Sequence, residues 1–167
     1  ISERMKYTGE IITPVNEDDI ESTIIKLQDM EVESVAVCLL HSYANPLHEE
    51  QIGQKLVNAL SGIPISLSHK VLPEFKEYER MSTTTINAYV SPRMKLYLTE
   101  LMERISDMGV NSEVYLMQSN GGTTSAKSAI RKPIHTILSG PAGGAIGSIT
   151  LSKLIGELNT ISVDMGG

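Results

Sequence analysis

The stretch that decides the fold is "SVAVCLL", residues 34–40. Its apolar residues run without interruption instead of alternating with polar ones, which is the pattern of a strand buried on both faces. Helical patterns flank it. Asn16 is a candidate N-cap before one apolar stripe, and Asn45-Pro46 is a cap and first-position pair before another. A buried strand between two helices is typical of a parallel sheet covered by helices.

The same reasoning extends along the chain. Apolar runs predict strands near 35–40, 64–68, 113–118 and 160–164. Helical periodicity covers about 77–108, where Pro92 is expected to divide the helix because proline lacks a donor and disfavours helix before it. Further helices are expected at about 125–130, ended by Pro133, and from Pro141 to about 155. The prediction is an α/β fold, with a parallel or mixed sheet covered by helices.

Composition narrows the class of protein. The 167 residues are 41% hydrophobic with a mean hydropathy of −0.04, as in a globular domain. The net charge of −6 and the absence of a Lys/Arg-rich run argue against a nucleic-acid surface. No apolar run approaches the length of a membrane span. The single cysteine, Cys38, lies in the apolar run, where a buried thiol in a reducing cytoplasm is expected.

Three turns concentrate the small residues. "SNGG" (119–122), "SGPAGG" (139–144) and "DMGG" (164–167) hold seven of the 13 glycines. Such turns either serve loop geometry alone or bring backbone N–H groups close to a phosphate. "SNGG" and "DMGG" each follow a predicted strand, and ligands of open α/β sheets bind beyond the carboxyl ends of the strands.

Each turn has two interpretations. Asp164, at a strand end, either orients a metal-bound water or belongs to a structural turn. Gly143 and Gly144 cost about 1 kcal/mol each in a first helical turn, which indicates either a ligand at the helix N-terminus or tight helix packing. Asn120 either contacts a substrate or caps its own turn. Because "TTSAKSAI" looks helical, a strand-to-helix loop is expected here in place of a hairpin.

Two further features are weaker. His41 ends the first strand at the edge where the glycine turns are expected, either as a ligand-facing group or as a capping residue. The charged run "PEFKEYER" (73–80) is typical of a solvated helix start, although Glu74 or Arg80 could reach a cleft. The histidines show no metal-ligand spacing, and the sequence contains no Walker A loop or GxGxxG pattern.

Five motifs carry a resemblance: "VAVCLLHSYANPLHEEQIG", "LPEFKEYERMSTTTINAYVSP", "LMQSNGG", "ILSGPAGGAIG" and "DMGG". In this order and spacing, the chain resembles the hydantoinase A / 5-oxoprolinase family of actin-like (ribonuclease H-like) ATPases. The resemblance implies ATP- and Mg²⁺-dependent activation of a carbonyl or amide oxygen by phosphorylation, followed by opening of a cyclic amide. Acetone- and acetophenone-type carboxylases belong to the same family, so a carboxylase subunit is the alternative. A non-catalytic actin-like scaffold is another.

The resemblance also implies roles for residues. Asp164 would be catalytic and hold Mg²⁺ through water. The nucleotide-binding positions would be Gly140, Gly143, Gly144, Gly166 and Gly167. The substrate-binding positions would be His41, Ser119, Asn120, Gly121 and Gly122.

The resemblance further implies a central piece of a longer protein. About 1–110 would be the end of the first actin-like half, and about 111–167 the linking region and the start of the second half. A hydantoinase B-type subunit or domain is the expected partner, with no nucleic acid and no membrane. The isolated chain is expected not to hydrolyse ATP, because a phosphoryl-transfer site needs contacts from both sides of the γ-phosphate.

Overall fold

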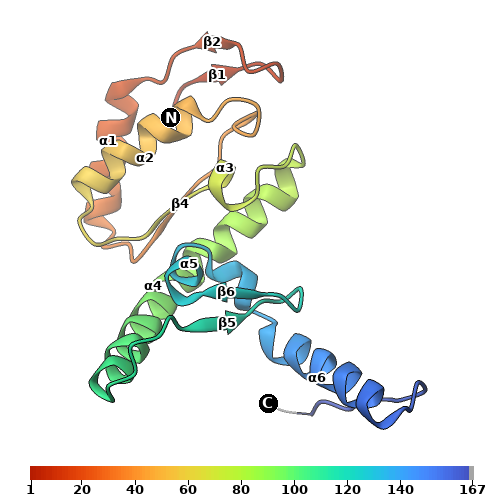
Figure 1. Cartoon of the computed structure of the whole chain (residues 1–167). Helices are drawn as coiled ribbons and strands as arrows, with labels where there is room; N and C mark the ends of the chain where they lie inside the picture. The colour runs from red at the N-terminus through yellow and green to blue at the C-terminus, as the bar shows by residue number, and fades with distance from the viewer. Residues whose placement is uncertain (166–167) are drawn as a thin grey trace. The chain divides into compact units, whose positions relative to one another are not determined.

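The computed structural model describes residues 1–165 and has the expected mixed α/β architecture, rich in helix, with its strands in small sheets (Figure 1). The chain divides into two compact units, residues 1–93 and the part from Met94 onward, which are described separately. The division falls inside the longest helix, α4 (Glu77–Asp107). Within residues 1–165, no helix combines the length and the apolar composition that a bilayer crossing requires.

The first unit is built around a parallel strand pair. β3 and β4 lie side by side in register from Val35 opposite Ile65 to Val37 opposite Leu67, which confirms the first two predicted strands. β1 and β2 form a separate antiparallel pair. The elements of this unit before α4 are β1 (Arg4–Met5), β2 (Ile11–Thr13), α1 (Glu17–Asp29), β3 (Val35–Val37), α2 (Leu47–Ala59), β4 (Ile65–Leu67) and α3 (Ser68–Val71).

The core of the first unit lies where α1 and α2 pack on the strand pair. Apolar residues at helical spacing in the helices meet the inward-facing residues of the strands. The predicted cap at Asn16 is confirmed, because its side chain accepts a hydrogen bond from Asp19 N at 3.0 Å. At α2 the N-cap is Pro46, one residue later than predicted, and the Asn45 side chain accepts a hydrogen bond from Leu47 N at 3.1 Å. The buried cluster consists of Ile20, Val37, Ile52, Leu56, Leu60 and Leu67.

The predicted break at Pro92 is wrong, because α4 continues through it to Asp107. One turn earlier, the Ser91 hydroxyl donates to the carbonyl of Asn87 at 2.6 Å. Ser91 and Asn87 are both buried, and Asn87 Nδ2 donates to Ser66 Oγ of β4 at 2.9 Å. This packing holds the helical backbone up to the proline and outweighs the local cost of its missing donor.

The second unit contains a hairpin followed by helices. β5 (Tyr115–Met117) pairs antiparallel with β6 (Thr123–Ser125), so the strand-to-helix loop predicted between them is wrong. The hairpin forms because Gly121 supplies a left-handed φ of 82°, as the Asn-Gly signal indicates. Next come α5 (Ala126–Arg131), the 3₁₀ helix η1 (Pro133–Thr136) and α6 (Ser139–Ile155), close to their predicted places.

The predicted strand at 160–164 is also wrong, since these residues adopt no regular structure. No other described strand is placed to pair with them, and an unpaired strand leaves its backbone groups without partners. Their apolar side chains are open to solvent, with Ile161 93% exposed. α6 is exposed in the same way, and its hydroxyls bond back to its own carbonyls, from Ser148 to Gly144, Thr150 to Ile146 and Ser152 to Ser148.

Candidate functional site

The "SNGG" segment is the turn of the β5–β6 hairpin. Gln118 N donates to Gly122 O at 2.7 Å, and Gly121 N donates to Gln118 O at 3.0 Å. The Asn120 side-chain oxygen accepts from Gly122 N at 2.9 Å. Of the two interpretations of Asn120, the structure therefore shows the turn-capping one for its Oδ1 atom.

Ser119 ties this turn to the start of α6. Its backbone N–H and its hydroxyl both donate to the His135 carbonyl, at 2.7 and 2.9 Å. The same hydroxyl accepts from the N–H of Leu138, the residue that precedes α6, at 3.3 Å. One serine thus fixes where the "SGPAGG" segment begins relative to the hairpin turn.

Packing reinforces this connection. A Cβ on Gly121 would lie 3.1 Å from the Ile146 side chain of α6, and the positive φ at Gly121 disfavours other residues independently. A Cβ on Gly143 would lie 3.7 Å from Met117 of β5, which is ordinary contact. The structure therefore brings the "SNGG" and "SGPAGG" segments together into one site, named here the turn–helix site (residues 118–122 and 138–144).

The N-terminus of α6 is open. No side chain caps it, its first turn contains Gly140 and Pro141, and Gly144 lies in the second turn. A Cβ on Gly140 or Gly144 would meet nothing within 4 Å in the described part of the chain. Packing among residues 1–165 therefore does not explain these two glycines.

The remaining predicted site residues lie elsewhere. Asp164 is exposed and lies outside regular structure, while Gly166 and Gly167 fall outside the described residues. His41 belongs to the first unit and has a positive φ of 60°. Over residues 1–165, no cluster of three or more His, Cys, Asp or Glu side chains is arranged to hold a metal ion.

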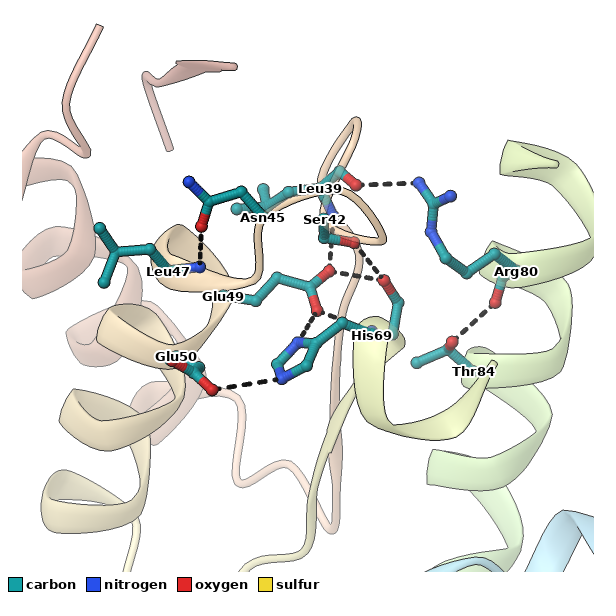
Figure 2. A network of polar contacts seen from close by, with 10 residues as sticks. Leu39, Ser42, Asn45, Leu47, Glu49, Glu50, His69, Arg80 and Thr84 are labelled. Atoms are coloured by element: carbon teal, nitrogen blue, oxygen red, sulfur yellow. Dashed lines mark hydrogen bonds and ion pairs between the residues drawn. The ribbon is translucent and has the colours of Figure 1, made fainter. Parts of the chain in front are cut away.

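Sequence reasoning missed a buried polar network in the first unit (Figure 2). Glu49, His69 and Arg80 are its charged or titratable members, and Arg80 is fully buried despite lying in the charged run 73–80. A signal was present: Arg80, Thr84, Asn87 and Ser91 are all buried and recur at the spacing of one helix face. The rest of the charged run, residues 73–79, is exposed as expected.

Two family models match the chain. The hydantoinase/oxoprolinase model covers residues 80–167, and the model of the hydantoinase/oxoprolinase N-terminal region covers residues 1–60. The chain belongs to the hydantoinase/oxoprolinase family. The resemblance carried by the five sequence motifs is therefore confirmed.

Relatives of this hydantoinase/oxoprolinase chain align with all or nearly all of it. An uncharacterized protein of Methanocaldococcus jannaschii is 41% identical over 100% of this chain and 25% of its own length. The caprolactamase subunit alpha of Pseudomonas jessenii is 31% identical over 100% of this chain and 24% of its own. The 5-oxoprolinase 1 of Arabidopsis thaliana is 34% identical over 94% of this chain and 12% of its own. The family chain thus spans a quarter or less of these relatives.

Solved structures agree with the family assignment. The ATP-dependent caprolactamase from Pseudomonas jessenii superposes with a TM-score of 0.83 at 30% identity, over 99% of this chain and 24% of that one. A nucleotide-free acetone carboxylase gives a TM-score of 0.80 at 28% identity, over 92% of this chain and 22% of that one. These likenesses confirm the expected α/β slice of an actin-like ATPase fold.

Proposed function

We propose that the protein containing this chain is an ATP-dependent hydrolase that opens a cyclic amide by phosphorylating its carbonyl oxygen. The observation that carries the proposal is the turn–helix site, where Ser119 joins the hairpin turn to an uncapped, glycine-rich helix N-terminus. Two relatives support the choice of substrate class, because they are named caprolactamase and 5-oxoprolinase.

The start of α6 is suited to a phosphate. Aligned peptide dipoles make a helix N-terminus electropositive, and its first N–H groups lack partners within the helix. Gly140 and Gly144 leave space for close approach, and Gly143 lies against Met117 without crowding. In this proposal these glycines hold a phosphate of ATP, which supplies the phosphoryl group for the reaction.

Asp164, Gly166 and Gly167 are assigned to a second phosphate loop. A carboxylate beside a glycine pair provides the hard oxygen ligand that Mg²⁺ prefers, and Mg²⁺ usually keeps several of its waters. Asp164 is exposed, so its carboxylate is accessible to a hydrated ion. In this proposal Asp164 would hold Mg²⁺ through water, and the cation would supply the positive charge that neutralises the phosphate oxygens during phosphoryl transfer.

The substrate-facing groups are assigned to Ser119–Gly122 and His41. Asn120 keeps Oδ1 on its own turn, so its amide NH₂ is the group that can donate to a substrate oxygen. Transfer of the γ-phosphoryl group to the carbonyl oxygen makes the carbonyl carbon electrophilic. Water then adds to that carbon, and the C–N bond breaks with protonation of the nitrogen, which leaves an acyl phosphate on the opened chain. A second water attacks the acyl phosphate and releases inorganic phosphate and the free carboxylate.

A carboxylase is the second candidate. The acetone carboxylase beta subunit of Xanthobacter autotrophicus is 30% identical over 100% of this chain, and the acetone carboxylase structure has a TM-score of 0.80. The ATP-dependent step on a carbonyl oxygen would be shared, and the two activities would diverge in what attacks afterwards. Relatives of both kinds are named as subunits, which supports a second subunit of the hydantoinase B type as partner.

The test is compound-dependent release of phosphate from ATP by the full-length protein with its partner subunit. Caprolactam, 5-oxoproline and hydantoin are compared with acetone plus bicarbonate. Release stimulated by a cyclic amide, with the opened amino acid as product, supports the hydrolase. Stimulation only by the ketone with bicarbonate transfers the proposal to the carboxylase. ATP turnover with none of these compounds and no nucleotide binding would leave the scaffold role.

A further inference from the structure

A fully buried carboxylate lies behind the turn that carries His41. Glu49 of α2 is 0% exposed, and its two oxygens accept four hydrogen bonds (Figure 2). Leu39 N donates at 2.9 Å and the Ser68 hydroxyl at 2.6 Å to one oxygen. His69 N at 3.0 Å and His69 Nδ1 at 2.7 Å contact the other. The donors come from the segments that follow β3 and β4.

A fully buried guanidinium lies on the other side of the same turn. Arg80 of α4 is 0% exposed and donates to Glu74 O at 2.7 Å and to Leu39 O at 2.9 Å. The Cζ atom of its guanidinium group lies 5.5 Å from the ring centre of Tyr43. Within residues 1–165, no carboxylate forms an ion pair with it.

The two buried charges meet through one residue of the backbone. The N–H of Leu39 donates to Glu49, and the C=O of Leu39 accepts from Arg80. The backbone dipoles of Leu39 therefore lie between an anion and a cation in the orientation that both favour. Burial of two charges is costly, and apolar residues would fill the same volume at least as well for stability alone. A role in positioning explains the arrangement better than a role in packing.

The turn held in this way has a strained residue at its centre. His41 has φ 60°, and its carbonyl accepts from Ala44 N at 2.9 Å and Asn45 N at 3.2 Å. The one other described non-glycine residue with positive φ, Glu31, sits at the end of α1, where such a φ is an ordinary helix termination. His41 follows a strand, and a left-handed histidine there persists only because its surroundings impose it.

Tyr43 connects the buried cation to His41. The Tyr43 hydroxyl lies 3.4 Å from His41 Nδ1, and the rings meet edge to face. The guanidinium of Arg80 lies over the Tyr43 ring, and this attractive cation–π contact holds the ring beside His41. With Tyr43 donating to Nδ1, the proton of the neutral imidazole lies on Nε2, which then donates outward. In the described part of the chain, no group hydrogen-bonds to that Nε2 atom.

The location suits a ligand. β3 and β4 are parallel, and the His41 turn (residues 39–44) and the Ser68-His69 pair follow their carboxyl ends. Ligands of open α/β sheets bind at that edge. We propose that Glu49, Arg80 and Tyr43 are positioning residues that hold the His41 turn so that His41 Nε2 donates a hydrogen bond to the carbonyl oxygen of the cyclic amide. The identity of this ligand rests on the proposed function.

The first experiment measures kcat and KM of cyclic-amide-dependent ATP hydrolysis by the full-length enzyme. Tyr43→Phe removes one hydroxyl and keeps the ring, so the fold is retained and KM should rise about tenfold with little change in kcat. Glu49→Gln should give at least the same rise in KM. Glu79→Gln, at an exposed position of α4, removes a carboxylate outside this network, so it is the matched control and should leave both constants unchanged.

A double-mutant cycle separates positioning from general stability. If Tyr43 and Glu49 act through His41, Tyr43→Phe and Glu49→Gln should change KM less than about twofold in a His41→Ala background. Effects as large as in the wild-type background would overturn the proposal. If Glu49→Gln does not fold, the Tyr43→Phe arm decides alone.

A third measurement does not depend on turnover. Diethyl pyrocarbonate modifies accessible imidazole nitrogens, and mass spectrometry reports its rate at His41. Tyr43→Phe should change that rate by about threefold or more, and Glu79→Gln should not. Should wild-type enzyme hydrolyse no cyclic amide while this change is seen, the proposed function fails and the positioning of His41 stands. An unchanged rate would show that Tyr43 does not hold His41.

Discussion

The two units place their polar and apolar groups in opposite ways. The first unit encloses Glu49 and Arg80, and its own backbone, hydroxyl and imidazole groups form hydrogen bonds with both side chains. The second unit turns apolar side chains of α6 outward, with Leu154 79% exposed, and bonds its hydroxyls back onto the helix. In the first unit, the residues that hold the His41 turn also contribute to the stability of the fold. In the second unit, substitutions at the glycine-rich start of α6 should change the free energy of unfolding little.

Among the substitutions that test this difference between the units, Glu49→Ala should change the free energy of unfolding most. Removal of the buried carboxylate leaves the donors of Leu39, Ser68 and His69 without an acceptor in the interior, so the free energy of unfolding should fall by about 3–5 kcal/mol. Urea unfolding followed by circular dichroism measures it. Glu79→Ala, at an exposed position of α4, should change it by less than about 0.5 kcal/mol. A loss below about 1 kcal/mol for Glu49→Ala would mean that the network does not stabilise the unit.

Equivalent deletions in apolar residues sharpen the contrast. Ile52 is buried in the first core, so Ile52→Ala should cost about 2–5 kcal/mol, including the cavity it leaves. The Leu154 side chain on α6 is largely exposed, so Leu154→Ala should change the free energy of unfolding of this chain by less than about 0.5 kcal/mol. The same urea experiment serves. Equal costs at the two positions would erase the distinction between the units.

Asp164→Asn tests the exposed end of the second unit in the full-length enzyme. The change keeps size and removes charge, so activity should fall roughly a hundredfold, about 2.7 kcal/mol of barrier, if Asp164 acts electrostatically. The melting temperature should not move, because the side chain is exposed. Turnover and thermal unfolding are measured on the same preparation. Near-normal turnover would end the catalytic assignment.

The smallest expected effect concerns the exposed Lys55–Glu17 ion pair, 2.8 Å long. The hydrogen bond from Lys55, and then its charge, lower the pKa of Glu17 in the folded chain. A depressed carboxyl pKa stabilises the fold above the unfolded-state pKa, and this contribution is lost as pH falls through the folded-state pKa. Lys55→Gln should therefore be slightly less stable than wild type near neutral pH and equal to it in acid. Urea midpoints across pH measure the difference, which added salt should shrink. A difference that persists in acid would assign the effect to packing.

Much of the fold could be predicted because its signals are local. The uninterrupted "SVAVCLL" run and the Asn16 cap act within a few residues of themselves. The strand at 160–164 could not be tested by local pattern, since a strand exists only with a partner. Pro92 was misjudged because packing of the preceding helix face on β4 outweighs a local propensity.

The site divides in the same way. The glycine turns were recognisable from composition, and the structure adds that Ser119 joins two of them. The environment of His41 was not recognisable, because Glu49 and Arg80 look like surface charges in sequence and meet only through folding. A charged residue at core spacing on a helix with small polar neighbours is the pattern to look for.

The link between Glu49 and Arg80 through the Leu39 backbone has a consequence for which residues can be substituted in this sequence. The coupling runs through the amide hydrogen and carbonyl oxygen of position 39, and every amino acid except proline has both. The leucine side chain can therefore be exchanged for another apolar one without loss of the backbone hydrogen bonds to Glu49 and Arg80. In related sequences we therefore expect Glu49 and Arg80 to be retained together, while the residue at position 39 varies. The identity of that residue would not indicate that its backbone links the two charges.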